Sequence, residues 1–253
     1  SNTLSTNVHA WPFFLEARKK GADIWVIDPY RNQTAQNANR HLKIKPGTDA
    51  ALALAVMKIL IDENLIDRPY IDRWTTGFDA LAERAAEYPA DRGAETTGLS
   101  AVEITDLARR YGRADKPFIR LGWGPARQLH GGMAARTICL LPALVGALGK
   151  TGAGLARATS PAFGLDKAPL ERRDLAPDGV RTINMVELGR ALTRFDDPPV
   201  QAIHVYQSNP AVIAPDSSQV IAGFKRDDLF VVVNEQMMTE TALMADIILP
   251  AAM

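Results

Sequence analysis

Cysteine is almost missing from this 253-residue sequence, which contains a single one, Cys139. A disulfide framework, a thiolate zinc site and an iron–sulfur cluster each require several cysteines, so none of them forms from this chain's residues alone. Cys139 lies in an apolar run, where a buried and inert thiol is expected. Histidine is also scarce, and the four are scattered without the spacing of metal ligands: His9, His41, His130 and His204. We predict neither a metal site nor a catalytic set within these residues.

Long apolar runs and an excess of one charge are absent too. The apolar stretch Thr137 to Leu148 is too short to span a bilayer and contains Pro142 and Gly146, and we expect no membrane segment. The 29 Lys and Arg residues balance 29 Asp and Glu residues without a basic stripe, which argues against nucleic acid as a partner. No signal peptide opens the sequence. The compartment stays open, with the cytoplasm slightly favoured.

What the sequence does contain is an alternation of apolar strands and amphipathic helices, the pattern of layered α/β folds. Strands are predicted at Asp23–Asp28, Pro117–Gly122, Ala202–Tyr206, Leu229–Val233 and Asp246–Leu249. Helices are predicted at Trp11–Lys20, Asp49–Asn64, Phe78–Tyr88, Ala101–Tyr111, Gly132–Leu148 and Asp216–Phe224, with another start near Asn184. Ser100 and Glu103 form a capping-box pattern, and residues 149–180 are expected to be irregular. We predict an α/β fold of two Rossmann-like three-layer units with mainly parallel sheets.

Polar residues and glycines follow several of these strands, at the edge where open α/β sheets bind ligands. The Asp28 carboxylate could accept hydrogen bonds from ribose hydroxyls, and Arg31 could pair with a phosphate, although a plain Asp-Pro turn explains the same pattern. Gly47 permits a tight turn before a helix that Thr48 would cap. Asp49, in the first turn of that helix, could accept paired donors from guanine. A plain capped helix explains this spacing equally well.

Two further segments have the same character. Gly122 and Gly124 would let a ligand approach the backbone, and the helix that follows would favour a pyrophosphate at its start. The spacing is not that of the nicotinamide-binding fingerprint. The Asn209 side chain, placed just before a proline, is a good dinucleotide contact. Asp216 could accept from a base or a ribose, or simply cap a helix.

In order, these segments resemble the molybdopterin oxidoreductase family, the dimethyl sulfoxide reductase group that includes formate dehydrogenases and nitrate reductases. The matching stretches cover nearly the whole chain: 21–29, 46–54, 122–124, 140–146, 208–210 and 228–250. The resemblance implies an internal portion of a longer enzyme, with an iron–sulfur segment and the molybdenum ligand upstream and a barrel domain downstream. It also implies that a strand precedes Ser1. Residues 1–120 would be an inserted α/β domain, and residues 121–253 the returning half of its partner domain.

The same resemblance implies a cofactor, molybdenum held by two molybdopterin guanine dinucleotides, with a 4Fe-4S cluster only in the upstream part. One guanosine tail would contact Asp28, Arg31, Gly47 and Asp49. The other would contact Gly122, Gly124, Ser208, Asn209, Asp216 and Asn234. Asn2 would match a family asparagine that follows the preceding strand. The full-length enzyme would be an oxidoreductase with electron-transfer subunits among its partners, and this portion alone would be inactive.

The glycine-rich turn at 149–154 departs from one branch of the family. Formate dehydrogenases usually carry an Arg-Gly-Gln-rich loop after this turn, whereas Leu155 to Ser160 follows here, so formate is in doubt as the substrate. Two alternatives remain open. Residues 116–149 loosely resemble the central domain of thiamine-diphosphate enzymes, although the stretch 239–250 does not fit them. A stand-alone nucleotide-binding module is the other, and an upstream cysteine cluster would argue against it.

Overall fold

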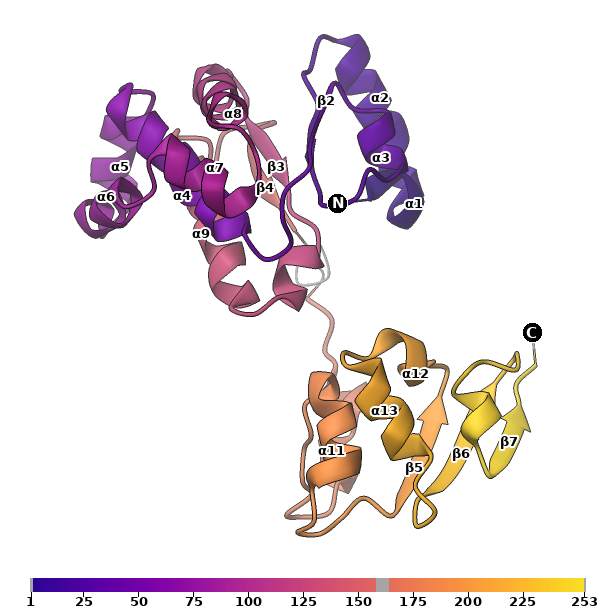
Figure 1. Ribbon diagram of the computed structural model, residues 1–253. Helices are drawn as coiled ribbons and strands as arrows, with labels where there is room; N and C mark the ends of the chain where they lie inside the picture. Colours follow the sequence, from indigo (N-terminus) through magenta and orange to yellow (C-terminus); the bar gives the residue numbers. More distant parts are fainter. Residues whose placement is uncertain (1, 158–163, 253) are drawn as a thin grey trace. The chain divides into compact units, whose positions relative to one another are not determined.

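The computed structural model describes residues 2–157 and 164–252, and the chain divides into two compact units, Ser1–Gly164 and Leu165–Met253 (Figure 1). Each unit has its own hydrophobic core. The division between compact units falls later than the predicted domain boundary near residue 120, because α9 (Gly131–Leu144) packs against α4 (Asp49–Asp62) of the first unit. The family-domain boundary itself remains a prediction.

The first unit contains two short parallel sheets. In one, β1 (Trp25–Ile27) pairs with β2 (Arg40–Leu42); in the other, β3 (Phe118–Arg120) pairs with β4 (Gly154–Ala156). Because both pairs are parallel, the carboxyl ends of the two strands in each sheet meet at one edge. The predicted site residues Asp28 and Gly122 follow β1 and β3 at these edges.

Helix α4 lies at the centre of the first unit. It begins at Asp49 and buries apolar side chains around its whole circumference, among them Leu52, Met57 and Leu60. A helix that is apolar all round must be enclosed, and α4 contacts four helices: α6 (Phe78–Ala86), α7 (Ala90–Thr97), α8 (Ala101–Arg113) and α9. The unit also contains α1 (Thr3–Thr6), α2 (Trp11–Lys19), α3 (Gln33–Gln36), α5 (Arg68–Trp74) and the 3-10 turn η2 (Gly124–Arg127).

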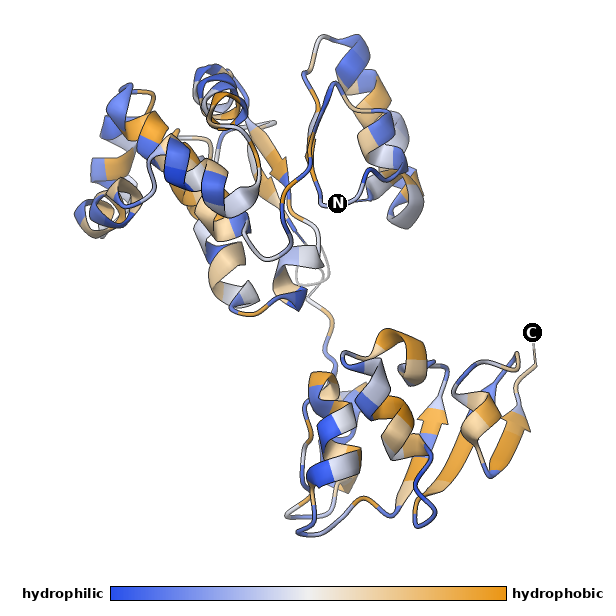
Figure 2. Ribbon diagram, viewed as in Figure 1, coloured by the Kyte–Doolittle hydropathy of each residue, from blue (hydrophilic) through white to orange (hydrophobic). Residues whose placement is uncertain are grey.

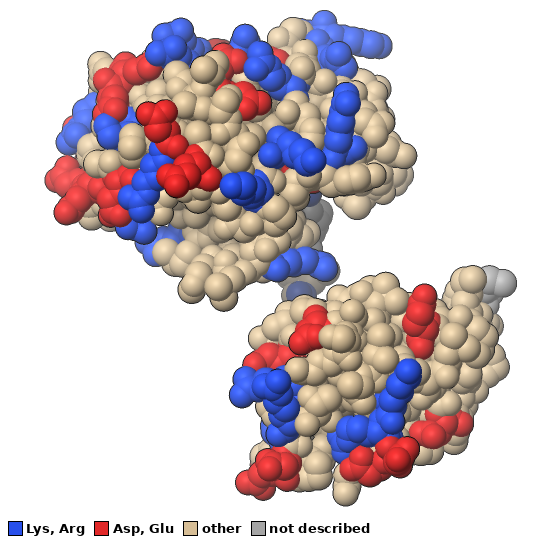
Figure 3. All heavy atoms as spheres, in the orientation of Figure 1, with Lys and Arg blue, Asp and Glu red and all other residues tan. Residues whose placement is uncertain are grey.

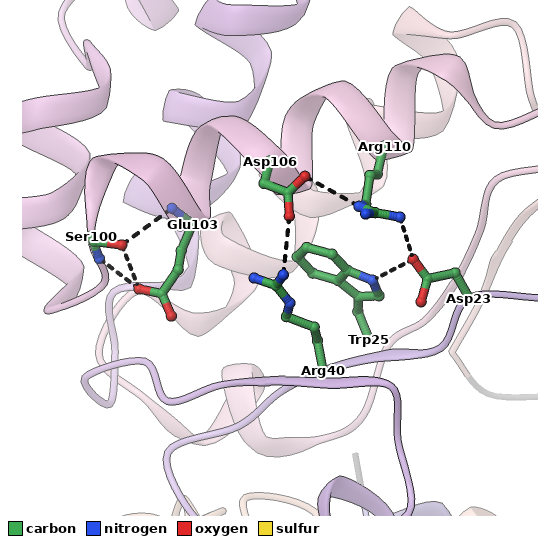
Figure 4. A network of polar contacts seen from close by, with 7 residues as sticks. All are labelled: Asp23, Trp25, Arg40, Ser100, Glu103, Asp106 and Arg110. Atoms are coloured by element: carbon green, nitrogen blue, oxygen red, sulfur yellow. Dashed lines mark hydrogen bonds and ion pairs between the residues drawn. The ribbon is translucent and has the colours of Figure 1, made fainter.

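A polar network fastens β1 and β2 to α8 (Figure 4). The guanidinium groups of Arg40 and Arg110 lie 5.1 and 5.7 Å from the centroid of the Trp25 ring. The Asp23 carboxylate accepts from Trp25 Nε1 at 2.9 Å and from Arg110 at 3.0 Å. Asp106 on α8 pairs with both arginines. The network therefore fixes the sheet that ends at Asp28 relative to the helices around α4.

The second unit is a three-stranded parallel sheet in the order β5 (Ala202–Tyr206), β6 (Phe230–Glu235) and β7 (Ile247–Pro250). Its strands are mostly apolar (Figure 2). Helices α11 (Leu188–Arg194) and α13 (Ser217–Phe224) pack against each other beside it, and α10 (Ala168–Glu171) and α12 (Pro210–Ile213) are short. Val220, Val231 and Val233 form the centre of the core.

The parallel strands and surrounding helices confirm the predicted α/β fold class. Several elements differ from the sequence-based prediction. β2, α5 and α7 were not predicted, and β4 lies inside the stretch expected to be irregular. Helix α9 ends at Leu144 rather than Leu148, because Gly146 adopts a left-handed conformation with φ of +61° that stops a helix. The capping box at Ser100 and Glu103 is confirmed.

The surface carries charges of both signs. On the face drawn in Figure 3, lysines and arginines are interspersed with aspartates and glutamates in both units. Among residues 2–157 and 164–252, no helix is long and apolar enough to cross a bilayer.

Candidate functional site

The carboxylate of Asp28 is held in a defined orientation at the end of β1. Its Oδ1 accepts from the Tyr30 backbone N–H at 3.0 Å, and its Oδ2 accepts from the Asn32 side-chain amide at 3.1 Å. Asn32 is itself buried and caps α3 through the Ala35 N–H. The Asp-Pro turn that the sequence analysis gave as the alternative to a ligand site at Asp28 is therefore present. It also presents a half-buried carboxylate at the strand end, where the predicted ligand would lie.

Asp49 opens α4 and lies close enough to Asp28 for the two charges to interact. Burial raises the pKa of Asp49 above its ordinary value, and the negative charge of Asp28 raises that pKa further. Gly47 precedes it with φ of +80°, a left-handed conformation that favours glycine. The predicted capping role of Thr48 is wrong in one respect: its hydroxyl donates to the Lys45 carbonyl at 2.7 Å instead of bonding the helix start.

Two other predicted contacts lie near the start of the chain. Asn2 accepts through Oδ1 from the Thr34 hydroxyl at 3.2 Å, which places it beside α3. Arg31 is exposed, and its guanidinium makes no ion pair with any residue that the structure describes. Its charge is thus available to a ligand, as the phosphate prediction requires.

The glycine-rich segment after β3 lies beside the turn that precedes α4. A Cβ added to Gly47 would lie 3.6 Å from Gln128 Oε1, so the loop after η2 approaches the Gly47 turn. Gly124 has open space where a side chain would project. The resemblance assigns Gly47 and Gly124 to different guanosine tails, an assignment that stays a prediction. Within the first unit the loops that carry them are close neighbours.

In the second unit, Asn209 joins the carboxyl ends of β5 and β6. Its Oδ1 accepts from the Thr241 hydroxyl at 2.7 Å, and its Nδ2 donates to Glu240 at 2.8 Å. Thr241 is fully buried and accepts from the Ala211 N–H at 3.1 Å. The hydrogen bond from Asn209 lowers the pKa of Glu240. The Asn209 amide is thus oriented by the loop after β6. The hydrogen bond to Asn209 also holds Glu240 at the carboxyl ends of the strands.

The remaining residues predicted in this unit lie near the same edge of the sheet. Asp216 caps α13, accepting from the Gln219 N–H at 3.3 Å, so the simple capping interpretation describes its contacts. Asn234 lies on β6 in register with Tyr206 of β5, and Ser208 follows β5. All three stand at the carboxyl side of the sheet or at the helix start above it.

Sequence reasoning missed three residues at these edges. Arg157 follows β4, a strand too short and glycine-rich to predict, and stacks on Trp123. Gln128 and Glu240 are placed by contacts with residues distant in the sequence. Within the described ranges no group of three His, Cys, Asp or Glu residues is arranged to hold a metal. Two surface hollows, lined by Glu171 and Asp174 and by Asn64 and Asp67 among others, contain none of the predicted site residues.

Parallel strands with polar residues and glycines at their carboxyl ends define an α/β protein of the kind that binds ligands at sheet edges. The chain belongs to the molybdopterin oxidoreductase family, whose model matches residues 9–253. This membership favours the resemblance over the thiamine-diphosphate alternative, because the match includes both residues 116–149 and the terminal stretch 239–250.

Individual relatives agree with this membership. The chain is 43% identical over 251 residues to the probable oxidoreductase YoaE of Bacillus subtilis, covering 99% of this chain and 37% of that protein. It is 32% identical to the F420-dependent formate dehydrogenase subunit alpha of Methanocaldococcus jannaschii, covering 100% of this chain and 40% of that protein. The solved structure of acetylene hydratase from Pelobacter acetylenicus superposes with a TM-score of 0.74 at 26% identity, covering 96% of this chain and 38% of that one. The chain thus spans well under half the length of these relatives.

Proposed function

We propose that this chain is the part of a molybdenum oxidoreductase that cradles the nucleotide tails of two molybdopterin guanine dinucleotides. The metal supplies the redox chemistry when the cofactor is bound, and the protein supplies binding and orientation. The longer protein would add a 4Fe-4S cluster, the molybdenum ligand and contacts to electron-transfer subunits. The chain alone would have no turnover.

The observation that carries this proposal is that Asp28 and Asp49 are both half-buried and lie close enough in the first unit for their charges to interact. Asp28 already accepts from the Tyr30 N–H and the Asn32 side-chain amide, and a carboxylate has further lone pairs that can accept from the donors of a bound ligand. Ribose hydroxyls and the N–H groups of guanine are such donors. Arg31, exposed and without an ion pair among the described residues, adds a charge suited to a phosphate beside them. The residues present therefore fit a nucleotide tail.

The test is cofactor retention in the full-length protein. We expect Asp28→Ala and Asp49→Ala each to lower the molybdenum and guanine-nucleotide content of the purified protein, since loss of a charged hydrogen-bond acceptor weakens binding by about tenfold or more. Metal analysis and nucleotide release after acid treatment measure both quantities. Asp72→Ala is the matched control, because Asp72 is an exposed carboxylate on α5 that pairs with Arg68. Cofactor content unchanged in both site variants would contradict the proposal.

The loop after Gly154 concerns the identity of the substrate. The departure from the formate dehydrogenase pattern at Leu155 to Ser160 argues against formate, although one relative is named a formate dehydrogenase. Of this stretch, residues 158–160 lie outside the described residues. Another relative is named acetylene hydratase, so similarity across this region accompanies differently named activities.

A further inference from the structure

Arg157 is a cation that makes no ion pair with any residue that the structure describes. It directly follows β4, at the carboxyl end of the β3–β4 sheet, and its guanidinium carbon lies 4.7 Å from the centroid of the Trp123 ring. Its Nε is buried and has no hydrogen-bond partner. No ion pair joins it to any residue in the described parts of the chain. A buried N–H without an acceptor is unfavourable, and native proteins rarely keep one without a reason.

A second arginine strengthens the positive field at the same sheet end. Arg120, the last residue of β3, donates through Nη1 to the carbonyl oxygens of Ala156 at 3.2 Å and of Arg157. These bonds tie its guanidinium to the ends of both strands. It likewise has no carboxylate partner among the described residues. Two guanidinium groups thus lie at one edge, and no carboxylate of residues 2–157 or 164–252 forms an ion pair with either.

We propose that Arg157 is an oxyanion-binding residue, with Trp123 as the platform that orients it. Stacking on an indole fixes the plane of a guanidinium and leaves its edge free for two parallel hydrogen bonds to oxygens. Such an edge suits a phosphate or a carboxylate. Two sources share this chemistry: the diphosphate of a nucleotide cofactor, and a small anionic substrate. Only the first source rests on the proposed function. The neighbouring Gly124 leaves open space for the ligand's approach.

The experiment uses the full-length protein with Arg157→Gln, which removes the charge, and Arg157→Lys, which keeps the charge but not the planar edge. Arg136→Gln is the matched control, because Arg136 is exposed on α9 and makes no ion pair with the described residues. Inorganic pyrophosphate is titrated into cofactor-free protein by calorimetry. Formate is titrated into cofactor-loaded protein in the same way, as a probe for small carboxylates in general and not as the proposed substrate. Molybdenum and guanine-nucleotide contents are measured in parallel.

For the diphosphate source, we expect Arg157→Gln to raise the Kd for pyrophosphate by about tenfold or more, Arg157→Lys to raise it less, and Arg136→Gln to leave it unchanged. Cofactor content should fall in the same order. For the substrate source, only formate binding weakens. Unchanged binding of both anions in Arg157→Gln would overturn the inference and leave Arg157 as packing for Trp123.

The two proposals can fail separately. If the wild-type protein contains neither molybdenum nor guanine nucleotide, the proposed function fails, while the pyrophosphate titration still decides the role of Arg157. If Arg157→Gln does not fold, Trp123→Ala replaces it. That variant keeps the cation and removes its platform, and we expect pyrophosphate binding to weaken by several-fold. Unaltered binding in Trp123→Ala would then count against the proposal.

Discussion

At the scale of single residues, Asp49 shows a conflict between stability and binding. Burial raises its pKa, and Asp28 adds to the rise. A carboxyl with a raised folded-state pKa supports folding below its ordinary pKa of about 4, and that support is lost as the pH rises through the raised value. We therefore expect Asp49→Asn to raise the melting temperature of cofactor-free protein at neutral pH and to change it less at acidic pH.

Thermal denaturation of wild type and Asp49→Asn across this pH range measures the difference. Asp72→Asn serves as the exposed control, and we expect its melting temperature to gain nothing over that of wild type as the pH rises toward neutral. A melting-temperature difference that stays constant with pH would show that Asp49 titrates normally. The same substitution should weaken cofactor retention, so stability and binding should move in opposite directions.

The residues that sequence reasoning identified share a local signal. Asp28 ends an apolar run, and Asp49 opens a long apolar helix, so neighbours in the sequence reveal both. Arg157 and Glu240 lack such a signal. Arg157 becomes a strand-end residue only because three residues of β4 pair with β3, and Glu240 is brought to Asn209 from 31 positions away. Their placement depends on tertiary pairing.

At the scale of elements, α9 begins on two glycines with different roles. A Cβ at Gly131 would lie 2.3 Å from the Pro125 carbonyl oxygen, whereas one at Gly132 would meet nothing within 4 Å. We expect Gly131→Ala to displace η2 and lower the free energy of unfolding by about 1–3 kcal/mol. Gly132→Ala, the matched control, should raise it by up to about 1 kcal/mol, because alanine favours a helix. Urea denaturation measures both, and equal effects would contradict this packing.

Helices and strands that are long, or that show a regular apolar pattern, were the ones predicted correctly from the sequence. The long helices α4 and α8 and the strand β5 were predicted closely, since each shows its pattern within its own sequence. The three-residue strand β2 begins with Arg40 and His41, which give no apolar signal, and its identity comes from its parallel register with β1. Helix α7 has too few apolar residues to show a stripe by itself.

At the scale of the whole molecule, the two separate cores predict separate responses to mutation. Leu192 is fully buried in the second core and Leu60 in the first. We expect Leu192→Ala to destabilise the second unit by about 2–5 kcal/mol and to leave amide protection in the first unit nearly unchanged. Leu60→Ala should do the reverse. Hydrogen exchange followed by mass spectrometry resolves the units, and equal loss of protection in both would show that they unfold together.

The predicted domain boundary and the division into compact units depend on different information. The boundary near residue 120 came from the order of predicted strands and helices and from the family resemblance, whereas compactness depends on the contacts within these residues. The chain spans 37–40% of the length of the relatives compared. Such relatives contain further residues that can pack against the matched part, so a domain boundary of the family need not coincide with the division between compact units in this chain.

The enclosure of α4 has a consequence for how a ligand would be received. Four helices contact α4, so Asp49 in its first turn cannot shift without disturbing the core. Any adjustment on ligand binding must then come from exposed segments such as 123–130, because the turn after β1 is held by hydrogen bonds of Asp28 and Asn32. Because the Asp49 side of the binding region needs no rearrangement, the reorganisation cost of ligand binding is kept low.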